Sequence, residues 1–390
     1  MQMTDTSMGN DGRRKLNILI MPSWYFSYRR DNVTTGIFHY EQAVDLQNYC
    51  NVAVYYPFDR TLEEDMVRHE DRGVLTYRSQ FHPKERIGNR IRIFRSFRKI
   101  REEFQPDIIF AHVAVEAGKY AAFLSDFYHI PLVLMEHSST EVSLAGKVGY
   151  YISKYVYGHC DYIACCSENL KNNLQQFFPK LKFHVVYNGI QPADIVSGSG
   201  KNYRVEGVTN IVIVGLFYSI DIKGYQFLLP AMRQILDKGC QAVLHIVGEG
   251  EYREHYMQMA KELGIDKECI FYGDCPRDKV YEIVGQMDFF VSSSILECSG
   301  VSVQEAMLLG KPVLVTKSGG ANSLVTRDTA IVVDKGSTQA LAEGMEEMIR
   351  RYGEFDTEKI KEYAENKFEI SHISRQYMEI FYDLACKDSK

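Results

Sequence analysis

The chain alternates short apolar runs with segments of helical periodicity along most of its length, and this alternation constrains the fold more than any other feature. A first set of apolar, β-rich runs occupies residues 16–21, 52–56, 107–111, 132–135, 162–166 and 184–187. A second set occupies residues 210–215, 242–247, 269–272, 288–291, 313–315 and 330–333. Strands that alternate with helices are typical of parallel, doubly wound sheets. The two sets predict two Rossmann-like domains of the α/β class.

The two sets of strands meet at a stretch with the composition of a linker. Residues 192–203 follow Asn188-Gly189 and contain a proline and a Ser-Gly-Ser-Gly run. Such clusters interrupt helices and strands. A length of 390 residues is also enough for about two domains. We therefore expect one domain over residues 1–190, a second over 191–370, and a final helix within 371–390.

Composition excludes several kinds of protein. A net charge of −6 argues against a general nucleic-acid binder, because phosphate backbones are bound by clustered Lys and Arg. The nine cysteines contain no Cys-x-x-Cys pair, so neither a zinc site nor a disulfide framework is indicated. The first apolar run ends at Pro22, which is too early for a signal peptide, and no run approaches the ~20 residues of a membrane helix. We expect a cytoplasmic protein that does not span a membrane.

Two glutamates eight positions apart, Glu297 and Glu305, form the most specific motif. A predicted buried strand precedes Glu297, and a predicted helix over residues 303–309 contains Glu305. Glu297 is therefore expected on the loop that leaves a strand, and Glu305 in the first turns of the next helix. Open α/β sheets bind ligands at such loops, where the N–H groups of a helix start can hold a phosphate. The alternative is that Glu297 caps a helix and that Glu305 is a solvated helix residue.

The residues around these glutamates favour the ligand-binding interpretation. Gly300 lies between them, and residues 310–313 form a Gly-x-Pro-Val sequence that begins a strand. In this whole pattern the chain resembles the retaining glycosyltransferases of family 4, which have the GT-B fold. The resemblance implies two Rossmann-like domains that face a cleft, with the C-terminal helix returning to the N-terminal domain. The N-terminal domain would bind the acceptor and the C-terminal domain a nucleotide-sugar donor.

The resemblance also implies roles for the donor-binding residues. Glu305 would accept hydrogen bonds from ribose hydroxyls, and Glu297 would bind hydroxyls of the donor sugar. Gly300, Val301 and Ser302 would offer backbone N–H groups to the sugar or the diphosphate.

Lys223, at the start of a predicted helix, matches the family's Lys-Gly pair that holds the donor diphosphate. A lysine is unfavourable near the positive end of the helix dipole, which supports a ligand role over that of an ordinary surface lysine. The family usually has an arginine shortly before this lysine, and Leu216 stands in its place. One cationic contact with the diphosphate is therefore expected to be missing.

Two further residues are expected to border the site from the N-terminal domain. Gly36 opens the first helix, where the family has a glycine loop under the donor phosphates, although a turn that needs a positive φ would also explain a glycine. His137 follows the strand 132–135, and the resemblance gives it a catalytic role beside the transferred sugar. The alternative is a structural histidine. His112 ends a neighbouring strand and is a weaker candidate for a contact with the acceptor.

The predicted function is transfer of a sugar, with retention, from a nucleotide diphosphate sugar to an acceptor hydroxyl in the synthesis of a cell-surface polysaccharide or glycolipid. His137, Glu297 and Lys223 are the predicted catalytic residues. No cofactor is expected, and no metal, since the chain has no Asp-x-Asp triplet. Two alternatives remain at this point: a GT-B nucleotide-sugar epimerase, and a catalytically degenerate subunit that only binds the donor.

The segment 84–101 carries a charge opposite to that of the whole chain. It holds eight Lys and Arg side chains and one acid, with Ile87, Ile91, Phe94 and Phe97 at helical spacing. A helix with an apolar and a basic face suits an anionic membrane surface. We expect either peripheral binding to the inner face of the membrane, with a glycan or lipid-linked acceptor, or an apolar face that packs on the domain beneath solvated arginines.

Overall fold

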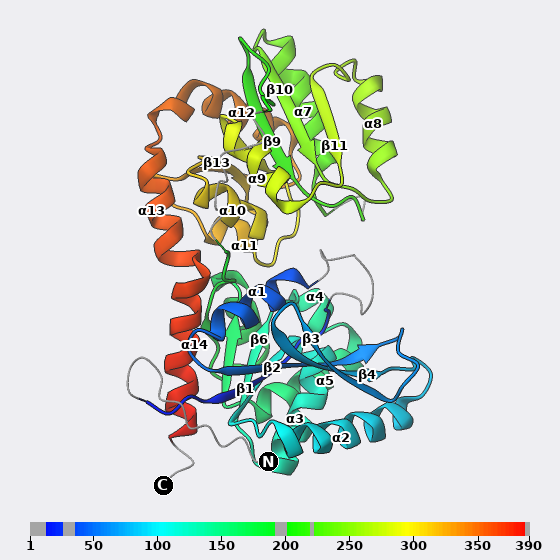
Figure 1. Cartoon of the computed structure of the whole chain (residues 1–390). Coiled ribbons are helices and arrows are strands. Elements are labelled where there is room, and N and C mark those ends of the chain that lie inside the picture. Colours follow the sequence, from blue (N-terminus) through cyan, green and yellow to red (C-terminus); the bar gives the residue numbers. More distant parts are fainter. Residues whose placement is uncertain (1–12, 26–35, 192–200, 219–221, 387–390) are drawn as a thin grey trace. The chain divides into compact units, whose positions relative to one another are not determined.

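The computed structural model describes residues 13–25, 36–191, 201–218 and 222–386, and these form two compact units (Figure 1). The first unit comprises residues 1–191 together with 370–390, and the second comprises 192–369. Both divisions lie within one residue of the expected domain boundaries. Within residues 192–203, the expected linker, residues 192–200 lie outside the described part of the chain.

The first unit is built on an eight-stranded sheet with the order β3-β4-β2-β1-β5-β6-β7-β8. Its strands are β1 (Asn17–Met21), β2 (Asn51–Asp59), β3 (Met66–Asp71), β4 (Val74–Gln80), β5 (Ile108–His112), β6 (Leu132–Glu136), β7 (Tyr162–Cys165) and β8 (His184–Val185). From β1 the chain extends the sheet first towards β4 and then, from β5, towards β8. The direction of winding thus reverses between β1 and β5, and such a switch point is where doubly wound sheets bind ligands.

The hairpin β3–β4 corrects the expectation of a wholly parallel sheet. β3 pairs antiparallel with β4 at the sheet edge, and neither strand was predicted. The two-residue turn Arg72-Gly73 has positive φ at both residues, which suits the twist of a tight hairpin. The strands contain several charged residues, so the apolar pattern alone did not reveal them. At the base of the hairpin, the fully buried guanidinium of Arg78 pairs with Asp59 and Asp71.

Helices cover this sheet, and the last helix of the chain is one of them. The helices are α1 (Ile37–Leu46), α2 (Arg86–Glu103), α3 (Lys119–Tyr128), α4 (Thr140–Ser143), α5 (Gly146–His159), α6 (Glu168–Phe177) and α14 (Ile370–Ala385), with a π-helical turn η1 (Val113–Gly118). Tyr377 and Phe381 of α14 pack on Phe110 of β5, with ring centroids 4.6 and 5.5 Å apart. The expectation that the C-terminal helix returns to the N-terminal domain is therefore met.

The second unit contains a six-stranded parallel sheet with the order β11-β10-β9-β12-β13-β14. Its strands are β9 (Thr209–Val214), β10 (Ala242–Val247), β11 (Cys269–Gly273), β12 (Phe289–Ser292), β13 (Val313–Thr316) and β14 (Ala330–Val333). Its helices are α7 (Tyr225–Asp237), α8 (Arg253–Glu262), α9 (Arg277–Gln286), α10 (Val301–Leu308), α11 (Gly320–Ser323), α12 (Thr338–Arg351) and α13 (Thr357–Phe368), with the 3₁₀ turn η2 (Tyr352–Glu354). The switch point lies between β9 and β12, the strands that precede Lys223 and Glu297.

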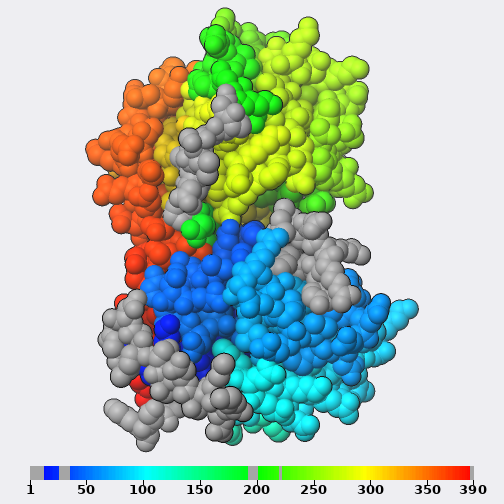
Figure 2. All heavy atoms as spheres, viewed as in Figure 1, coloured from blue at the N-terminus to red at the C-terminus, as the bar shows by residue number. Residues whose placement is uncertain are grey.

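The basic segment forms α2 on the surface of the first unit (Figure 2). Phe97, one of the four apolar residues at helical spacing, is fully buried, with Ile93 and Ile100 on the same side of the helix. Ile87 and Ile91 are exposed, at 75% and 47%. α2 therefore has two apolar faces, one in the core and one outside. Among the described residues, no helix is long and apolar enough to cross a membrane.

Candidate active site

Lys223 and Glu297 meet at the switch point of the second unit. The Lys223 Nζ lies 2.7 Å from Glu297 Oε2, and the two side chains are only 27% and 18% exposed. Ser294 Oγ donates a hydrogen bond to the same carboxylate oxygen over 3.3 Å. The amine and the carboxylate are separated by more than seventy residues in the sequence, so the fold itself assembles this pair.

The backbone around this pair is fastened by hydrogen bonds between loops. Ile295 N donates to Ile222 O over 2.8 Å, which ties the segment before Lys223 to the end of β12. Glu297 N donates to Ser318 O over 3.0 Å, and Gly320 N donates to Glu297 O over 2.6 Å. The loop that carries Glu297 is therefore held between the loops that follow β9 and β13.

Glycines allow the two helix starts at this site to approach neighbouring backbone. Gly224 and Gly300 are the N-cap residues of α7 and α10, and both have the left-handed conformation. A Cβ on Gly224 would overlap the backbone oxygen of Ser293, which no change of rotamer could relieve. The first N–H groups of a helix have no acceptor within the helix, so Gly300, Val301 and Ser302 present donors at the start of α10.

Glu305 lies on α10 and belongs to a second cluster that the sequence did not predict. Its Oε1 accepts hydrogen bonds from Tyr281 OH over 2.9 Å and from Arg277 Nη2 over 3.1 Å. Both partners come from α9, so α9 orients this carboxylate. Glu305 is thus not a solvated helix residue, because its side chain is only 18% exposed and is held by two donors.

In the first unit, His137 belongs to a cluster of three histidines. Its Nε2 lies 2.9 Å from His112 Nδ1, and the two rings are stacked in parallel planes. His39, on α1, contacts both rings. Burial lowers the pKa of His137 to about 4, and burial also holds the pKa values of His39 and His112 well below the usual range. All three rings are therefore neutral at pH 7.

Glu136 fixes the strand end that carries His137. Its fully buried carboxylate accepts hydrogen bonds from Ala114 N, Ser138 N and Tyr157 OH over 2.9 to 3.1 Å. Its pKa is raised because burial outweighs these hydrogen bonds. The carboxylate thus ties the start of η1 and the loop after β6 to one point, which positions His137.

Gly36 adopts φ 78° and lies against the backbone that follows β1. A Cβ there would approach Trp24 O and Tyr25 Cα to 2.8 Å. The glycine is therefore required by local packing, which is the alternative that the sequence left open. This does not test its predicted role under the donor phosphates.

A hollow of about 530 Å³ opens at the carboxyl ends of β1, β2, β5 and β6 in the first unit. Aromatic side chains line much of it, namely Trp24, Tyr25, Tyr56, Phe58 and Phe81. Asp59, Glu116 and Ser138 add polar groups, and Ser138 directly follows His137. The sequence analysis did not single out these residues. Aromatic positions near predicted strand ends were the only signal for them.

Comparison with known proteins agrees with this architecture. The family model for glycosyltransferase family 4 matches residues 42–194, and the model for glycosyl transferases group 1 matches residues 209–367. The chain belongs to the family 4 glycosyltransferases. Their GT-B fold is also that of an Anabaena protein, HepE, solved in complex with UDP: the TM-score is 0.73 at 19% identity, over 94% of this chain and 100% of that one.

Two relatives of this glycosyltransferase each align with about two thirds of the chain. An uncharacterized glycosyltransferase of Methanocaldococcus jannaschii is 28% identical over 67% of this chain and 71% of its own. The alpha-monoglucosyldiacylglycerol synthase of Streptococcus pneumoniae is 23% identical over 68% of this chain and 64% of its own.

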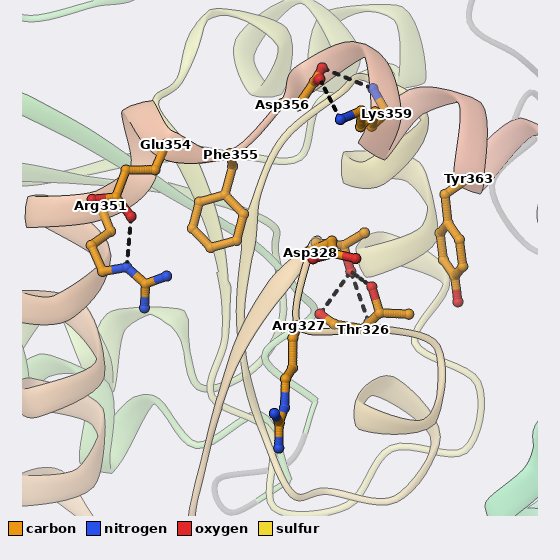
Figure 3. A pocket seen from close by; sticks show the side chains of 10 residues that line it. Thr326, Arg327, Asp328, Arg351, Glu354, Phe355, Asp356, Lys359 and Tyr363 are labelled. Carbon is orange, nitrogen blue, oxygen red and sulfur yellow. Dashed lines mark hydrogen bonds and ion pairs between the residues drawn. The ribbon is translucent and has the colours of Figure 1, made fainter.

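The glycosyltransferase has another hollow in its second unit, of about 510 Å³, but none of the predicted site residues lines it (Figure 3). Its charged side chains pair with one another: Arg351 with Glu354, and Lys359 with Asp356. These local pairs lie beside η2 and the start of α13, away from the switch point of the sheet. We therefore do not assign this hollow to the active site.

Proposed function

We propose that this glycosyltransferase transfers a sugar from a nucleotide diphosphate sugar to an acceptor hydroxyl with retention of the anomeric configuration. The observation that carries the proposal is the contact of Lys223 with Glu297 beside the start of α10. A cation, a carboxylate and free helix N–H groups together match the chemistry of a sugar joined to a diphosphate. The complex of the Anabaena protein HepE with UDP supports a nucleotide as the bound group.

The donor is proposed to bind along β9 and β12 of the second unit. Glu305 accepts hydrogen bonds from the ribose hydroxyls, and Arg277 keeps its carboxylate in place. Gly300, Val301 and Ser302 donate backbone hydrogen bonds to the sugar or the diphosphate. Glu297 binds hydroxyls of the donor sugar. In the absence of donor, Lys223 forms an ion pair with the carboxylate of Glu297.

Lys223 is proposed to stabilise the leaving diphosphate. Charge grows on this group as the glycosidic bond breaks, so a fixed ammonium acts more strongly in the transition state than in the ground state. Leu216, which replaces the family's usual arginine, is 52% exposed and offers no charge. Lys223 and the helix N–H groups would then meet the charge without a metal ion. This makes the enzyme more dependent on Lys223 than a relative with both cations.

The acceptor is proposed to bind in the aromatic hollow of the first unit. Aromatic rings such as Trp24 and Tyr56 offer flat apolar faces to the C–H face of a sugar ring, and the exposed carboxylate of Glu116 accepts hydrogen bonds from hydroxyls. His137 directly precedes Ser138, which lines this hollow. Because its ring is neutral, His137 can accept a hydrogen bond from, or donate one to, a hydroxyl near the reacting centre.

A second surface of the first unit could contact the membrane that holds a lipid-linked acceptor. α2, α3 and α5 enclose a groove of about 1050 Å³. Its apolar side chains include Phe123, Phe127 and Tyr151, which are 50%, 57% and 64% exposed. Its cations are Arg90, Arg95, Arg98, Lys99 and Lys119. Exposed aromatic rings beside basic side chains are typical of proteins that lie on an anionic membrane.

We therefore propose peripheral binding to an anionic membrane and a lipid-linked acceptor. The similarity to the Streptococcus pneumoniae protein, a glucosyldiacylglycerol synthase, supports a lipid acceptor. The outer apolar residues of α2, Ile87 and Ile91, continue the same surface. A glycolipid or a lipid-linked polysaccharide precursor would be the product.

A thermal-shift screen of nucleotide sugars tests the donor proposal. A ligand that binds only the folded protein raises the melting temperature by mass action. One nucleotide sugar should stabilise wild type, and the same compound should have a much smaller effect on Glu305→Ala. If no nucleotide or nucleotide sugar stabilises the protein at millimolar concentration, the proposed donor site is wrong.

A further inference from the structure

His39, His112 and His137 bring three imidazoles from separate elements to one place. His39 lies on α1, His112 ends β5 and His137 directly follows β6. One ring nitrogen of each lies within 4.8 Å of a ring nitrogen of both others. His39 and His112 are almost fully buried, and His137 is half-buried. The cluster is therefore reachable from solvent through His137 only, as far as the described residues show.

Two nitrogens of this cluster lack partners within the described part of the chain. Among the residues that the structure describes, His39 Nε2 and His112 Nε2 are buried and make no hydrogen bond. A buried polar atom without a partner destabilises the folded state, because it has lost its hydrogen bonds to water. Such atoms in a native protein call for an explanation, and a bound ion is one of them. The rings are also neutral, so each has a lone pair available, as a metal ligand requires.

We propose that His39, His112 and His137 bind a Zn²⁺ ion. Imidazole nitrogen suits Zn²⁺ and its neighbours in the first transition row, whereas Mg²⁺ and Ca²⁺ prefer oxygen ligands, which these three side chains do not offer. Zn–N bonds of about 2.0–2.1 Å in a tetrahedral site place the nitrogens about 3.3 Å apart. The three ligand nitrogens, which lie within 4.8 Å of one another, would close in to this spacing. Three protein ligands leave the fourth position to water.

The residues around the cluster can stabilise the positive charge of a Zn²⁺ ion. Glu136, the residue before His137, has a fully buried carboxylate whose partners include Tyr157 and Ser138. A buried carboxylate one residue from a ligand offsets part of the ion's charge without itself being a ligand. Trp24 packs against His39 and His137, which limits the motion of both rings.

Zn²⁺ at this site would inhibit the enzyme. The ion would occupy the lone pair of His137, which the proposed mechanism needs for a hydroxyl near the reacting centre. This consequence rests on the proposed function, but ion binding does not. The two can therefore fail separately: a protein that binds one Zn²⁺ without losing activity would keep the site and reject the catalytic role of His137.

Cobalt substitution tests binding independently of activity. After treatment with a chelator, the full-length protein is titrated with Co²⁺ and the visible absorption is followed. One equivalent should produce the intense bands of four- or five-coordinate cobalt, and Zn²⁺ should remove them. His39→Gln and His112→Gln should each lose these bands, whereas His255→Gln, an exposed histidine of the second unit, should keep them. Absence of the bands in wild type, or unchanged bands in both cluster variants, would overturn the proposal.

Crystals of wild type soaked in Zn²⁺ give a test that does not depend on the folding of a variant. Anomalous scattering at the zinc edge should show an ion among the three imidazoles. An ion found only at other surface histidines, or no ion at all, would also overturn the proposal.

Discussion

Lys223 Nζ lies 2.7 Å from Glu297 Oε2, at the carboxyl ends of two adjacent strands in the second unit. In the proposed mechanism the donor separates this pair, because the diphosphate takes the lysine and the sugar takes the carboxylate. The free enzyme thus keeps its largely buried ammonium neutralised until the substrate arrives. Because each member of the pair contacts a different part of the donor, substituting one residue at a time measures its contribution to donor binding and turnover.

Lys223→Ala should lower kcat by roughly ten- to a hundredfold, since a hydrogen bond to a charged group is worth about 1.5–3 kcal/mol. Leu216 leaves no cation at the neighbouring family position to compensate. Steady-state kinetics with the identified donor measure the effect. Lys317→Ala removes an exposed lysine that pairs with Asp334 and serves as the matched control. Equal kcat values for both variants would argue against the role of Lys223.

Glu305→Ala should weaken donor binding by a similar factor and affect kcat less, because the ribose hydroxyls are bound equally in the ground and transition states. Arg277→Ala should have part of the same effect, since Arg277 acts through Glu305. The double variant should therefore bind the nucleoside diphosphate no more weakly than Glu305→Ala alone. Calorimetry with the nucleoside diphosphate gives all three affinities, and additive losses would mean that Arg277 contacts the donor by itself.

Chelation should leave activity intact. The proposed site meets the charge of the diphosphate with Lys223 and the start of α10, so EDTA should not reduce the initial rate. If trace Zn²⁺ occupies the histidine cluster, EDTA should raise the rate. A loss of activity on chelation that Mg²⁺ or Mn²⁺ restores would contradict the metal-independent mechanism.

Stability should fall on acidification between about pH 6.5 and pH 4. The folded-state pKa of His137 is about 4, below the ordinary value of 6.5, so the unfolded chain binds more protons in this window. The difference corresponds to about 3 kcal/mol from His137 alone, and His39 and His112 act in the same direction. Denaturant unfolding at several pH values measures the slope, which His39→Phe should reduce. An unchanged slope in this variant would show that His39 does not contribute.

Charge reversal on α2 should abolish membrane binding. Arg90→Glu, Arg95→Glu and Arg98→Glu together change three of the five cations of the groove to anions. Basic side chains near an anionic surface contribute about 1 kcal/mol each, so co-sedimentation with anionic liposomes should fall by more than tenfold. A control variant with Lys180, Lys267 and Lys335 changed to Glu has the same net charge and should still bind. Equal binding of wild type to neutral and anionic liposomes would show that the basic side chains of this groove do not contribute to membrane binding.

The sequence predicted the second unit better than the first, for a physical reason. β10 has the expected bounds, because a strand buried on both faces reads as a continuous apolar run. β14 also has the expected bounds, although it is an edge strand on which Val332 is exposed. The edge hairpin β3–β4 was missed because its exposed face carries charged residues such as Arg68 and Glu70. Periodicity placed Phe97 on one apolar face with Ile87 and Ile91 and left open whether that face enters the core. The structure buries Phe97 and exposes the two isoleucines.

The same distinction holds for the candidate site. Glu297, Glu305 and Lys223 stand in short motifs, so their positions could be predicted from local sequence. Their partners could not, since Arg277 and Tyr281 reach Glu305 from another helix. The histidine cluster likewise depends on β5 and β6 being neighbours in the sheet and on α1 bringing His39 against the ring of His112.

The anomeric configuration of the product tests the central claim most directly. The donor identified by thermal shift is incubated with an acceptor, and the coupling of the anomeric proton is recorded by NMR as the product forms. We predict a product with the same anomeric configuration as the donor, formed by wild type and at a much lower rate by Lys223→Ala. A product of inverted configuration, or a new nucleotide sugar formed without any acceptor, would contradict this mechanism.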